Sequence, residues 1–224
     1  MIKIKNLYAS YGKKEVLHNV SLDIEEKEIV TLVGSNGSGK STLLKSIYNI
    51  IDNKKGNIFF ENRDISNVET KKLLEKHIVY IGQKNNVFES FTVYQNLQVA
   101  SFYNNRNKNI ENILKEFPTL LKIQNKKARN LSGGQKQLLA LSMGLLNEPK
   151  LILFDEPSAG LDVKTLKLVF EKIKKLNENK NITFLIVEHR INEISKITDR
   201  FIALKLGKVF KSTKNKDELN DVFI

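Results

Sequence analysis

The stretch "TLVGSNGSGKSTLLKSI", residues Thr31–Ile47, places three glycines and a lysine between an apolar run and a segment whose apolar residues recur at helical spacing. Residues Gly34–Ser41 fit the pattern G-x-x-x-x-G-K-[ST]. The apolar run Ile29–Val33 in front of this pattern predicts a buried strand, and residues 41–50 predict a helix. A strand that enters a helix through such a glycine loop is typical of α/β folds with an anion-binding turn.

The glycines of this loop leave the backbone free to aim successive N–H groups at one point, and the following helix adds the partial positive charge of its N-terminus. Lys40 can neutralise outer phosphates, and the Ser41 hydroxyl can ligate a magnesium ion that bridges phosphate oxygens. The loop therefore predicts binding of ATP or GTP with Mg²⁺, and the alternative is a plain glycine-rich turn. The residues expected to contact the nucleotide are Gly34, Ser35, Asn36, Gly37, Ser38, Gly39, Lys40, Ser41 and Thr42.

Two adjacent carboxylates follow an apolar strand in "LILFDEPSAGLD", residues 151–162. Asp155 at the strand end can hold magnesium through water beside a phosphate loop, and Glu156 can orient or deprotonate an attacking water. Alone, the pair would be interpreted as an acidic strand-to-loop turn closed by Pro157. The phosphate loop elsewhere in the chain favours the catalytic interpretation.

A second glycine-rich turn lies in "LSGGQKQLLALSMGLL", residues 131–146. Ser132 and Gln135 have the spacing of a capping box, in which each side chain satisfies a backbone N–H group at the start of a helix. Gly133 and Gly134 leave further backbone donors exposed there, which predicts a second anion site. Both interpretations stay open on this pattern alone, because one nucleotide does not obviously need two such turns.

The rest of the chain predicts an α/β fold with one helical region. The segments "IKIKNL", "VSLDI" and "NIFFENRDI" have the alternation and composition of strands, with Gly12 and Gly56 expected to mark turns. From Val93 to about Leu146 the apolar residues fall at helical intervals. Strands return as "LILFD" and "ITFLIVEH" around the helix-like stretch Thr165–Leu176, which is the rhythm of a parallel sheet with crossover helices.

The 224 residues carry a formal charge of +12, yet basic doublets such as Lys13–Lys14 and Lys126–Lys127 are spread along the chain. A dedicated nucleic-acid surface would concentrate them on one element, so a solvated surface is the simpler interpretation and no nucleic acid is expected. The absence of cysteine excludes disulfides and thiolate metal sites. No apolar run is long enough to cross a bilayer, and the first residues alternate like a strand, unlike a secretory signal.

The glycine loop, the acidic pair and above all "LSGGQ" resemble the nucleotide-binding subunits of ATP-binding cassette (ABC) transporters, over nearly the whole chain. The resemblance implies one ABC ATPase domain over residues 1–224. Residues 1–83 and 147–224 would form a P-loop NTPase core, a mainly parallel sheet with flanking helices, together with an N-terminal antiparallel β subdomain. Residues 84–146 or so would form the Q-loop and an α-helical insert that carries the signature motif.

In this family two subunits pack head to tail, so that each signature closes on ATP held by the other subunit, which accounts for two anion sites. Gly34–Thr42 resemble the Walker A motif, and Leu151–Asp155 resemble Walker B. Tyr11 resembles the aromatic residue that stacks on adenine, with Val16 in the same pocket; without the resemblance, Tyr11 would be an ordinary strand aromatic. The resemblance implies ATP and Mg²⁺ as cofactors, with the magnesium ligands Ser41, Gln83 and Asp155.

Four residues resemble the catalytic set of the family. Glu156 is similar to the glutamate that polarises water, Lys40 to the Walker A lysine, and Gln83 to the Q-loop glutamine. His189 resembles the switch histidine that contacts the γ-phosphate, although alone it would be a satisfied residue at a strand end. The residues implied to complete the partner's site in trans are Ser132, Gly133, Gly134, Gln135 and the D-loop residue Asp162.

Within the family, "NLSGGQKQLLALSMGLL", "DEPSAGLD" and "IVEHR" look most like the ATPases of branched-chain amino acid importers. The expected partners are a second copy or a similar ATPase subunit, and membrane-spanning permeases contacted through the Q-loop and the helical insert. The expected place is the cytoplasmic face of the membrane. The alternatives are the ATPase of an efflux system and a soluble ABC ATPase that acts on nucleic acid or ribosomes.

Overall fold

Ten strands in two sheets organise the part of the chain that the computed structural model describes, residues 1–102 and 110–222. The strands are β1 (Ile2–Tyr11), β2 (Lys14–Ile24), β3 (Ile29–Val33), β4 (Lys54–Phe60), β5 (Arg63–Asp64), β6 (Ile78–Ile81), β7 (Leu151–Asp155), β8 (Thr183–Val187), β9 (Arg200–Lys205) and β10 (Lys208–Thr213). The helices are α1 (Lys40–Ile47), α2 (Thr70–Glu75), α3 (Val93–Phe102), α4 (Ile110–Glu116), α5 (Pro118–Leu121), α6 (Gly133–Leu145), α7 (Val163–Lys180) and α8 (Ile191–Ile194), with 3-10 helices η2 (Ala128–Asn130) and η3 (Lys216–Val222).

The larger sheet has the order β10-β9-β3-β8-β7-β6, in which all neighbours are parallel except the edge pair β10 and β9. Strand β8 lies between β3 and β7, and its last residue Val187 is in register with Leu32 on one side and with Asp155 on the other. Because the strands are parallel, their carboxyl ends meet at one edge, where open α/β sheets bind ligands.

The central strands are buried on both faces, since side chains alternate between two hydrophobic cores. On β7, for example, Ile152 and Phe154 enter the core beneath the sheet, whereas Leu151 and Leu153 enter the core above it. This double burial explains the continuous apolar runs in the sequence.

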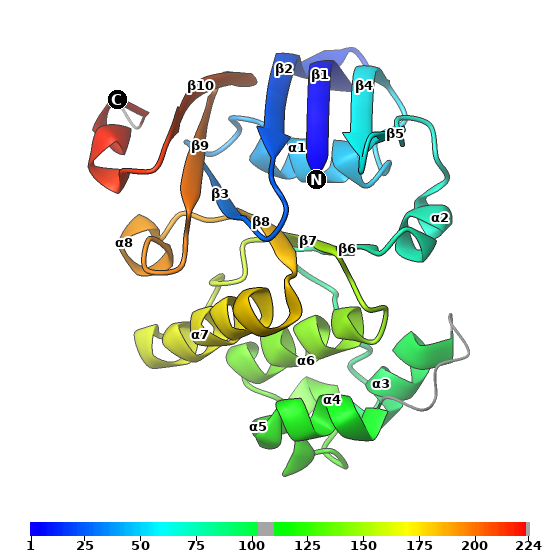
Figure 1. The fold of residues 1–224 in the computed structure, drawn as a ribbon. Coiled ribbons are helices and arrows are strands. Elements are labelled where there is room, and N and C mark those ends of the chain that lie inside the picture. Colours follow the sequence, from blue (N-terminus) through cyan, green and yellow to red (C-terminus); the bar gives the residue numbers. More distant parts are fainter. Residues whose placement is uncertain (103–109, 223–224) are drawn as a thin grey trace.

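The upper core is closed by α1 and by the antiparallel sheet β2-β1-β4-β5, which lies above α1 in Figure 1. Leu43, Leu44 and Ile47 on one face of α1 are fully buried in this core. Because α1 is held between two sheets, the loop in front of it has a rigid base.

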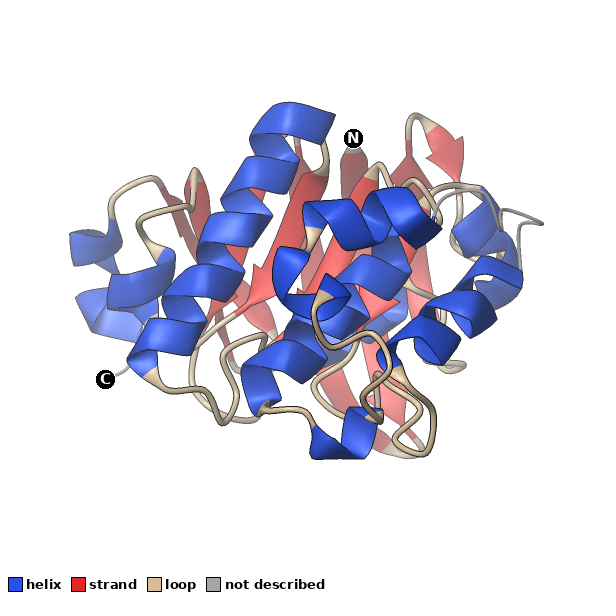
Figure 2. Cartoon of the chain, turned by 90° about the horizontal axis from the view of Figure 1, so that it is seen from below, coloured by secondary structure: helices blue, strands red, loops and turns tan. Residues whose placement is uncertain are grey.

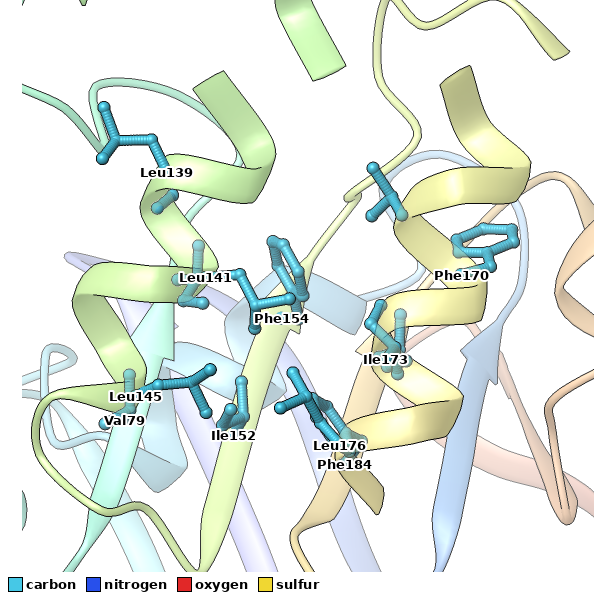
Figure 3. Packing of buried hydrophobic residues seen from close by; sticks show 14 of the residues in the cluster. Val79, Leu139, Leu141, Leu145, Ile152, Phe154, Phe170, Ile173, Leu176 and Phe184 are labelled. Carbon is cyan, nitrogen blue, oxygen red and sulfur yellow. The ribbon is translucent and has the colours of Figure 1, made fainter. Parts of the chain in front are cut away.

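The lower core is closed by the long helices α6 and α7, which cover the opposite face of the large sheet (Figure 2). In Figure 3, Leu141 of α6 and Ile173 of α7 flank Phe154 of β7. Helices α3, α4 and α5 lie beyond α6, as Figure 1 shows. None of the helices within residues 1–102 and 110–222 is both long and apolar enough to cross a membrane.

The predicted α/β fold is confirmed, including the strand rhythm and the helices between residues 93 and 146. One local expectation is wrong. Gly12 lies in the turn between β1 and β2, but Gly56 lies inside β4, opposite the register shift of β1 between Lys5 and Tyr8. Its φ of 104° and the approach of the Asn6 carbonyl make glycine necessary there.

We expect Gly56→Ala to lower the free energy of unfolding by about 2–4 kcal/mol, because it adds a steric clash to an unfavourable φ. An added Cβ would lie 2.4 Å from the Asn6 carbonyl oxygen. Gly12→Ala is the matched control, since Gly12 also has a positive φ but has open space around it, and we expect about 1 kcal/mol there. Urea unfolding of both variants measures the difference, and equal losses would contradict the bulge argument.

Candidate functional site: a nucleotide and magnesium site

The glycine loop leaves β3 and enters α1 at the carboxyl edge of the large sheet. Gly34, Gly37 and Gly39 all have positive φ angles, of 148°, 79° and 102°. An added Cβ on Gly34 would lie 2.2 Å from the Leu204 carbonyl oxygen, and one on Gly39 would lie 2.7 Å from the Leu17 side chain. Glycine at positions 34 and 39 is therefore dictated by close packing under the loop as well as by backbone conformation.

The N-terminus of α1 has no side-chain cap, so its backbone N–H groups are available to an anion. Ser35, Asn36 and Gly37 at the top of the loop are exposed, whereas the base of the loop is buried. The hydroxyl of Ser38 is buried and has no hydrogen-bond partner among the described residues. An unsatisfied hydroxyl and a row of uncapped N–H groups fit a phosphate group.

Lys40 is almost fully buried and folds over its own loop, where Nζ donates to the carbonyl oxygens of Gly34 at 2.9 Å and Ser35 at 3.0 Å. Burial lowers the pKa of the Lys40 ammonium, although the nearby carboxylates of Glu156 and Asp155 act in the opposite direction. Desolvation of this kind strengthens the interaction of Lys40 with an anion that enters the loop.

Ser41 and Asp155 come from different elements and converge, since Ser41 Oγ donates to Asp155 Oδ1 at 2.9 Å. Burial raises the pKa of the Asp155 carboxyl and the neighbouring Glu156 adds to this, while the Ser41 hydrogen bond opposes it. A hydroxyl and a carboxylate oxygen side by side are the ligand types that Mg²⁺ takes from proteins, with phosphate and water completing its shell. The donor set therefore fits magnesium held jointly with a phosphate.

Glu156 lies between two polar side chains that come from other parts of the chain. Gln83 Nε2 donates to Glu156 Oε2, and His189 Nε2 lies 3.1 Å from Glu156 Oε1. Glu156 also has a φ of 50°, a conformation that side-chain-bearing residues rarely adopt and that clusters at functional sites. The structure thus brings together the three residues that the sequence predicted as catalytic beside Lys40.

Tyr11 and Val16 flank the loop from the antiparallel sheet. Tyr11 ends β1 with about half of its surface exposed, and Val16 on β2 packs against Gly39 of the loop. A half-exposed aromatic ring is suited to stacking on a base.

The second glycine turn has the predicted capping box at the start of α6. Gln135 N donates to Ser132 Oγ at 3.3 Å, and Ser132 N donates to Gln135 Oε1 at 3.1 Å. Gly134 is buried, and an added Cβ there would lie 1.9 Å from the Thr165 methyl group of α7. Gly134 is thus needed for packing inside the chain, while Ser132 and Gly133 remain exposed.

Within the described residues, no hydrogen bond joins the turn 132–135 to the loop 34–42 of the same chain. Gly133 instead lines a hollow of about 300 Å³ together with Gln83 and Ala159. Asp162 caps the N-terminus of α7 by accepting from Lys164 N and Thr165 N, both at 3.0 Å. One chain therefore brings together only some of the residues that the sequence predicted for the nucleotide site.

Two contributions to this site have no clear signal in the sequence. The phenol of Tyr80 on β6 donates to Asp155 Oδ2 at 3.4 Å, and burial raises the pKa of that phenol. Gly207 N, in the hairpin between β9 and β10, donates to the Ser38 carbonyl at 3.1 Å. Such contacts between distant segments depend on the order of the strands, which a local pattern does not reveal.

The geometry defines a nucleoside-triphosphate site of the P-loop class, and comparison with known proteins specifies its family. A family model described as "ABC transporter" matches residues 17–159. The chain is 34% identical over 219 residues to the probable branched-chain amino acid transport ATP-binding protein LivF of Archaeoglobus fulgidus. The aligned region covers 96% of this chain and 93% of the relative. The chain is also 32% identical to the high-affinity branched-chain amino acid transport ATP-binding protein BraG of Pseudomonas aeruginosa, with coverage of 93% and 91%.

A solved structure of similar fold is the dimeric post-hydrolysis state of the ATP-binding cassette MJ0796 bound to ADP and Pi. It superimposes with a TM-score of 0.84 at 31% identity, covering 96% of this chain and 99% of that one. The chain belongs to the ABC transporter family. Within that family it is an ATP-binding subunit that hydrolyses ATP.

We expect Asp155→Asn to abolish magnesium-dependent ATP hydrolysis while raising the melting temperature of the nucleotide-free protein. The folded state raises the pKa of Asp155, so its charged form costs free energy at neutral pH, and this cost falls as the pH falls through the folded pKa. Removing the charge should add about 2–4 °C, the shift that about 1 kcal/mol gives in a domain of this size. Calorimetry without nucleotide checks this result, and a lower melting temperature would contradict it.

Proposed function

We propose that the chain powers the import of amino acids by an ABC transporter, as one of two ATPase subunits on the cytoplasmic face of the membrane. In this proposal ATP and Mg²⁺ bind between two subunits, and hydrolysis separates them again. The single observation that carries the catalytic part is the position of Glu156, which Gln83 and His189 hold from both sides. The likeness to LivF and BraG supports the cargo class.

Each residue of the nucleotide site has a separate task in this proposal. Tyr11 and Val16 hold the base, and the loop Gly34–Thr42 binds the phosphates through its N–H groups. Lys40 leaves the carbonyl groups of Gly34 and Ser35 and turns to the outer phosphates. The adenine and phosphate subsites thus lie on rigid elements that belong to the two sheets.

Magnesium, when bound, would neutralise charge on the phosphates and would be held by Ser41, Asp155 and Gln83. Asp155 is kept in place by hydrogen bonds from Ser41 and Tyr80. Gln83 would contribute its amide oxygen to the ion, while its Nε2 donates to Glu156.

In the chemical step, a water oxygen attacks the γ-phosphorus while the bond from that phosphorus to the bridging oxygen of ADP breaks. Glu156 orients the water and accepts its proton, and His189 contacts the γ-phosphate. Lys40 stabilises the charge that spreads over the transferring group. The attack has a fixed direction because Glu156, which orients the water, is restrained by Gln83 and His189.

The residues that one chain leaves apart come together through a second subunit in this proposal. The exposed N-terminus of α6 at Ser132 and Gly133 would close on the γ-phosphate held by the partner, together with Gly134 and Gln135 of the same turn. The neighbouring Asp162 would contact the partner's site. The partner would be a second copy or a similar ATPase subunit, and the dimeric form of the MJ0796 cassette supports this arrangement.

We expect Glu156→Gln to bind ATP with nearly unchanged affinity and to reduce turnover by about 10³-fold or more, because an amide cannot accept the proton. The isosteric side chain keeps both neighbours in reach. Phosphate release and the binding of a fluorescent ATP analogue measure the two quantities separately. Turnover at the wild-type rate would remove Glu156 from the chemical step.

The proposed surface for the permease lies beside Gln83 and the start of α3. Phe88 and Phe91 are exposed by 49% and 39%, and their rings lie 5.7 Å apart. The backbone beneath them is fixed by the buried side chain of Asn96, which accepts from Phe88 N at 2.7 Å and donates to the Phe88 carbonyl at 3.1 Å. Two aromatic rings on a rigid loop next to Gln83 can pass a movement of the permease to the nucleotide site.

We expect Phe88→Glu to reduce ATP-driven uptake of leucine by about tenfold or more, while ATP hydrolysis by the isolated subunit stays within about twofold, because a charge at a docking anchor costs binding but leaves the nucleotide site intact. The assay uses proteoliposomes that contain the subunit and its co-expressed permeases, with ATP enclosed in the lumen so that uptake into the lumen corresponds to import.

Leu168→Glu is the matched control, since Leu168 is equally exposed but lies on α7. Normal uptake by Phe88→Glu would refute the docking surface. Active hydrolysis without any leucine uptake by the wild-type complex would refute the cargo and leave the ATPase mechanism untouched.

A further inference from the structure

Glu188 carries a carboxylate at the centre of the carboxyl edge of the large sheet. No step of the proposed reaction uses this carboxylate. Glu188 follows β8 directly and is only 1% exposed. Its backbone N–H continues the pairing of the sheet by donating to the Leu32 carbonyl at 3.2 Å. Because β8 lies between β3 and β7, this side chain stands between the phosphate loop and the acidic pair.

Four hydrogen bonds converge on the Glu188 carboxylate. Ser158 N donates to Oε1 at 2.8 Å, and Ser158 Oγ donates to Oε2 at 2.8 Å. His189 N and Arg190 N donate to the same Oε2 at 2.9 and 3.2 Å. Among the described residues, no lysine, arginine or histidine side chain is ion-paired with Glu188, so these donors alone compensate for its burial.

The two groups of donors belong to two different functional segments. His189 and Arg190 begin the segment of the switch histidine, whereas Ser158 belongs to the turn that follows Glu156. Ser158 is itself only 6% exposed, and Leu161 N donates to its carbonyl at 3.0 Å. A second link runs in parallel, because the guanidinium of Arg190 donates to the Leu161 carbonyl at 2.9 Å.

We propose that Glu188 is a positioning residue that joins the backbone of the switch histidine to the segment 158–162, so that the two segments move as one body. A shift of His189 toward a γ-phosphate is then transmitted through Ser158 both to Glu156, two residues earlier, and to Asp162 at the start of α7. The proposal rests on the roles assigned above to Glu156 and His189. Glu188 itself is no candidate base, because its oxygens are occupied and shielded from water.

The test compares Glu188→Gln and Ser158→Ala in the full chain, with Glu193→Gln as the control for loss of one negative charge on the adjacent segment. Glutamine keeps the shape of Glu188 but places an N–H group against the N–H donors. We expect kcat for ATP hydrolysis to fall about tenfold or more in Glu188→Gln, with KM for ATP within about twofold, because a small displacement of the water-orienting group acts on the transition state and leaves binding by the loop unchanged.

Ser158→Ala removes one of the four donors, so we expect a smaller loss of about threefold. Combining it with Glu188→Gln should add little to the loss from Glu188→Gln alone, because both substitutions break the same contact. Glu193→Gln should behave like wild type. The proposal is overturned if kcat per bound ATP is unchanged in Glu188→Gln. It is also overturned if Glu193→Gln changes kcat as much as Glu188→Gln does.

Glu156→Gln, assayed in parallel, separates this proposal from the function it rests on. An inactive Glu156→Gln together with a fully active Glu188→Gln refutes the positioning role alone, whereas an active Glu156→Gln refutes the assigned chemistry. If Glu188→Gln does not fold, the kcat and KM of Ser158→Ala alone test the proposal. A kcat loss at constant KM then supports the link through Ser158, and wild-type kcat overturns it.

Discussion

The parallel pairing of β8 with both β3 and β7 is the constraint on which the rest of the structure depends. Val187 is in register with Leu32 and with Asp155, so the three strands end at the same level. The acidic pair begins at the last residue of β7, and the phosphate loop and the switch histidine begin one or two residues beyond the ends of β3 and β8. A one-residue slip of β8 would turn its side chains to the opposite faces and separate the groups that must cooperate.

Burial on both faces makes this register robust. Alternate residues of each central strand enter the core above the sheet and the core below it. Helices α1, α6 and α7 pack against these two cores. Such packing carries a cost at the site itself, because Asp155 and Lys40 are held where burial disfavours their charged forms. A bound triphosphate and a divalent ion would offset this free-energy cost of burying charged groups.

Much of the fold and of the site is predictable from the sequence because the decisive signals are local. The glycine loop, the apolar run before Asp155 and the capping box at Ser132 each depend on a few neighbouring residues. The contacts of Tyr80 and Glu188 are not predictable in this way, since each joins segments distant in sequence. Gly56 shows the same limit, because a glycine that marks a turn and one that marks a β-bulge look alike until the partner strand is known. The roles of the site residues themselves remain predictions.

The central claim is that a second subunit completes each nucleotide site, and the absence of cysteine from the chain permits a direct measurement. Single-cysteine forms of the Glu156→Gln protein would carry Asn36→Cys in one copy and Ser132→Cys in the other, both at exposed positions. Mixed and treated with a short bis-maleimide, they should give a cross-linked heterodimer that requires ATP and Mg²⁺. If both thiols react with a monofunctional maleimide but no cross-linked heterodimer forms in saturating ATP, the second subunit does not close on this loop and the account is wrong.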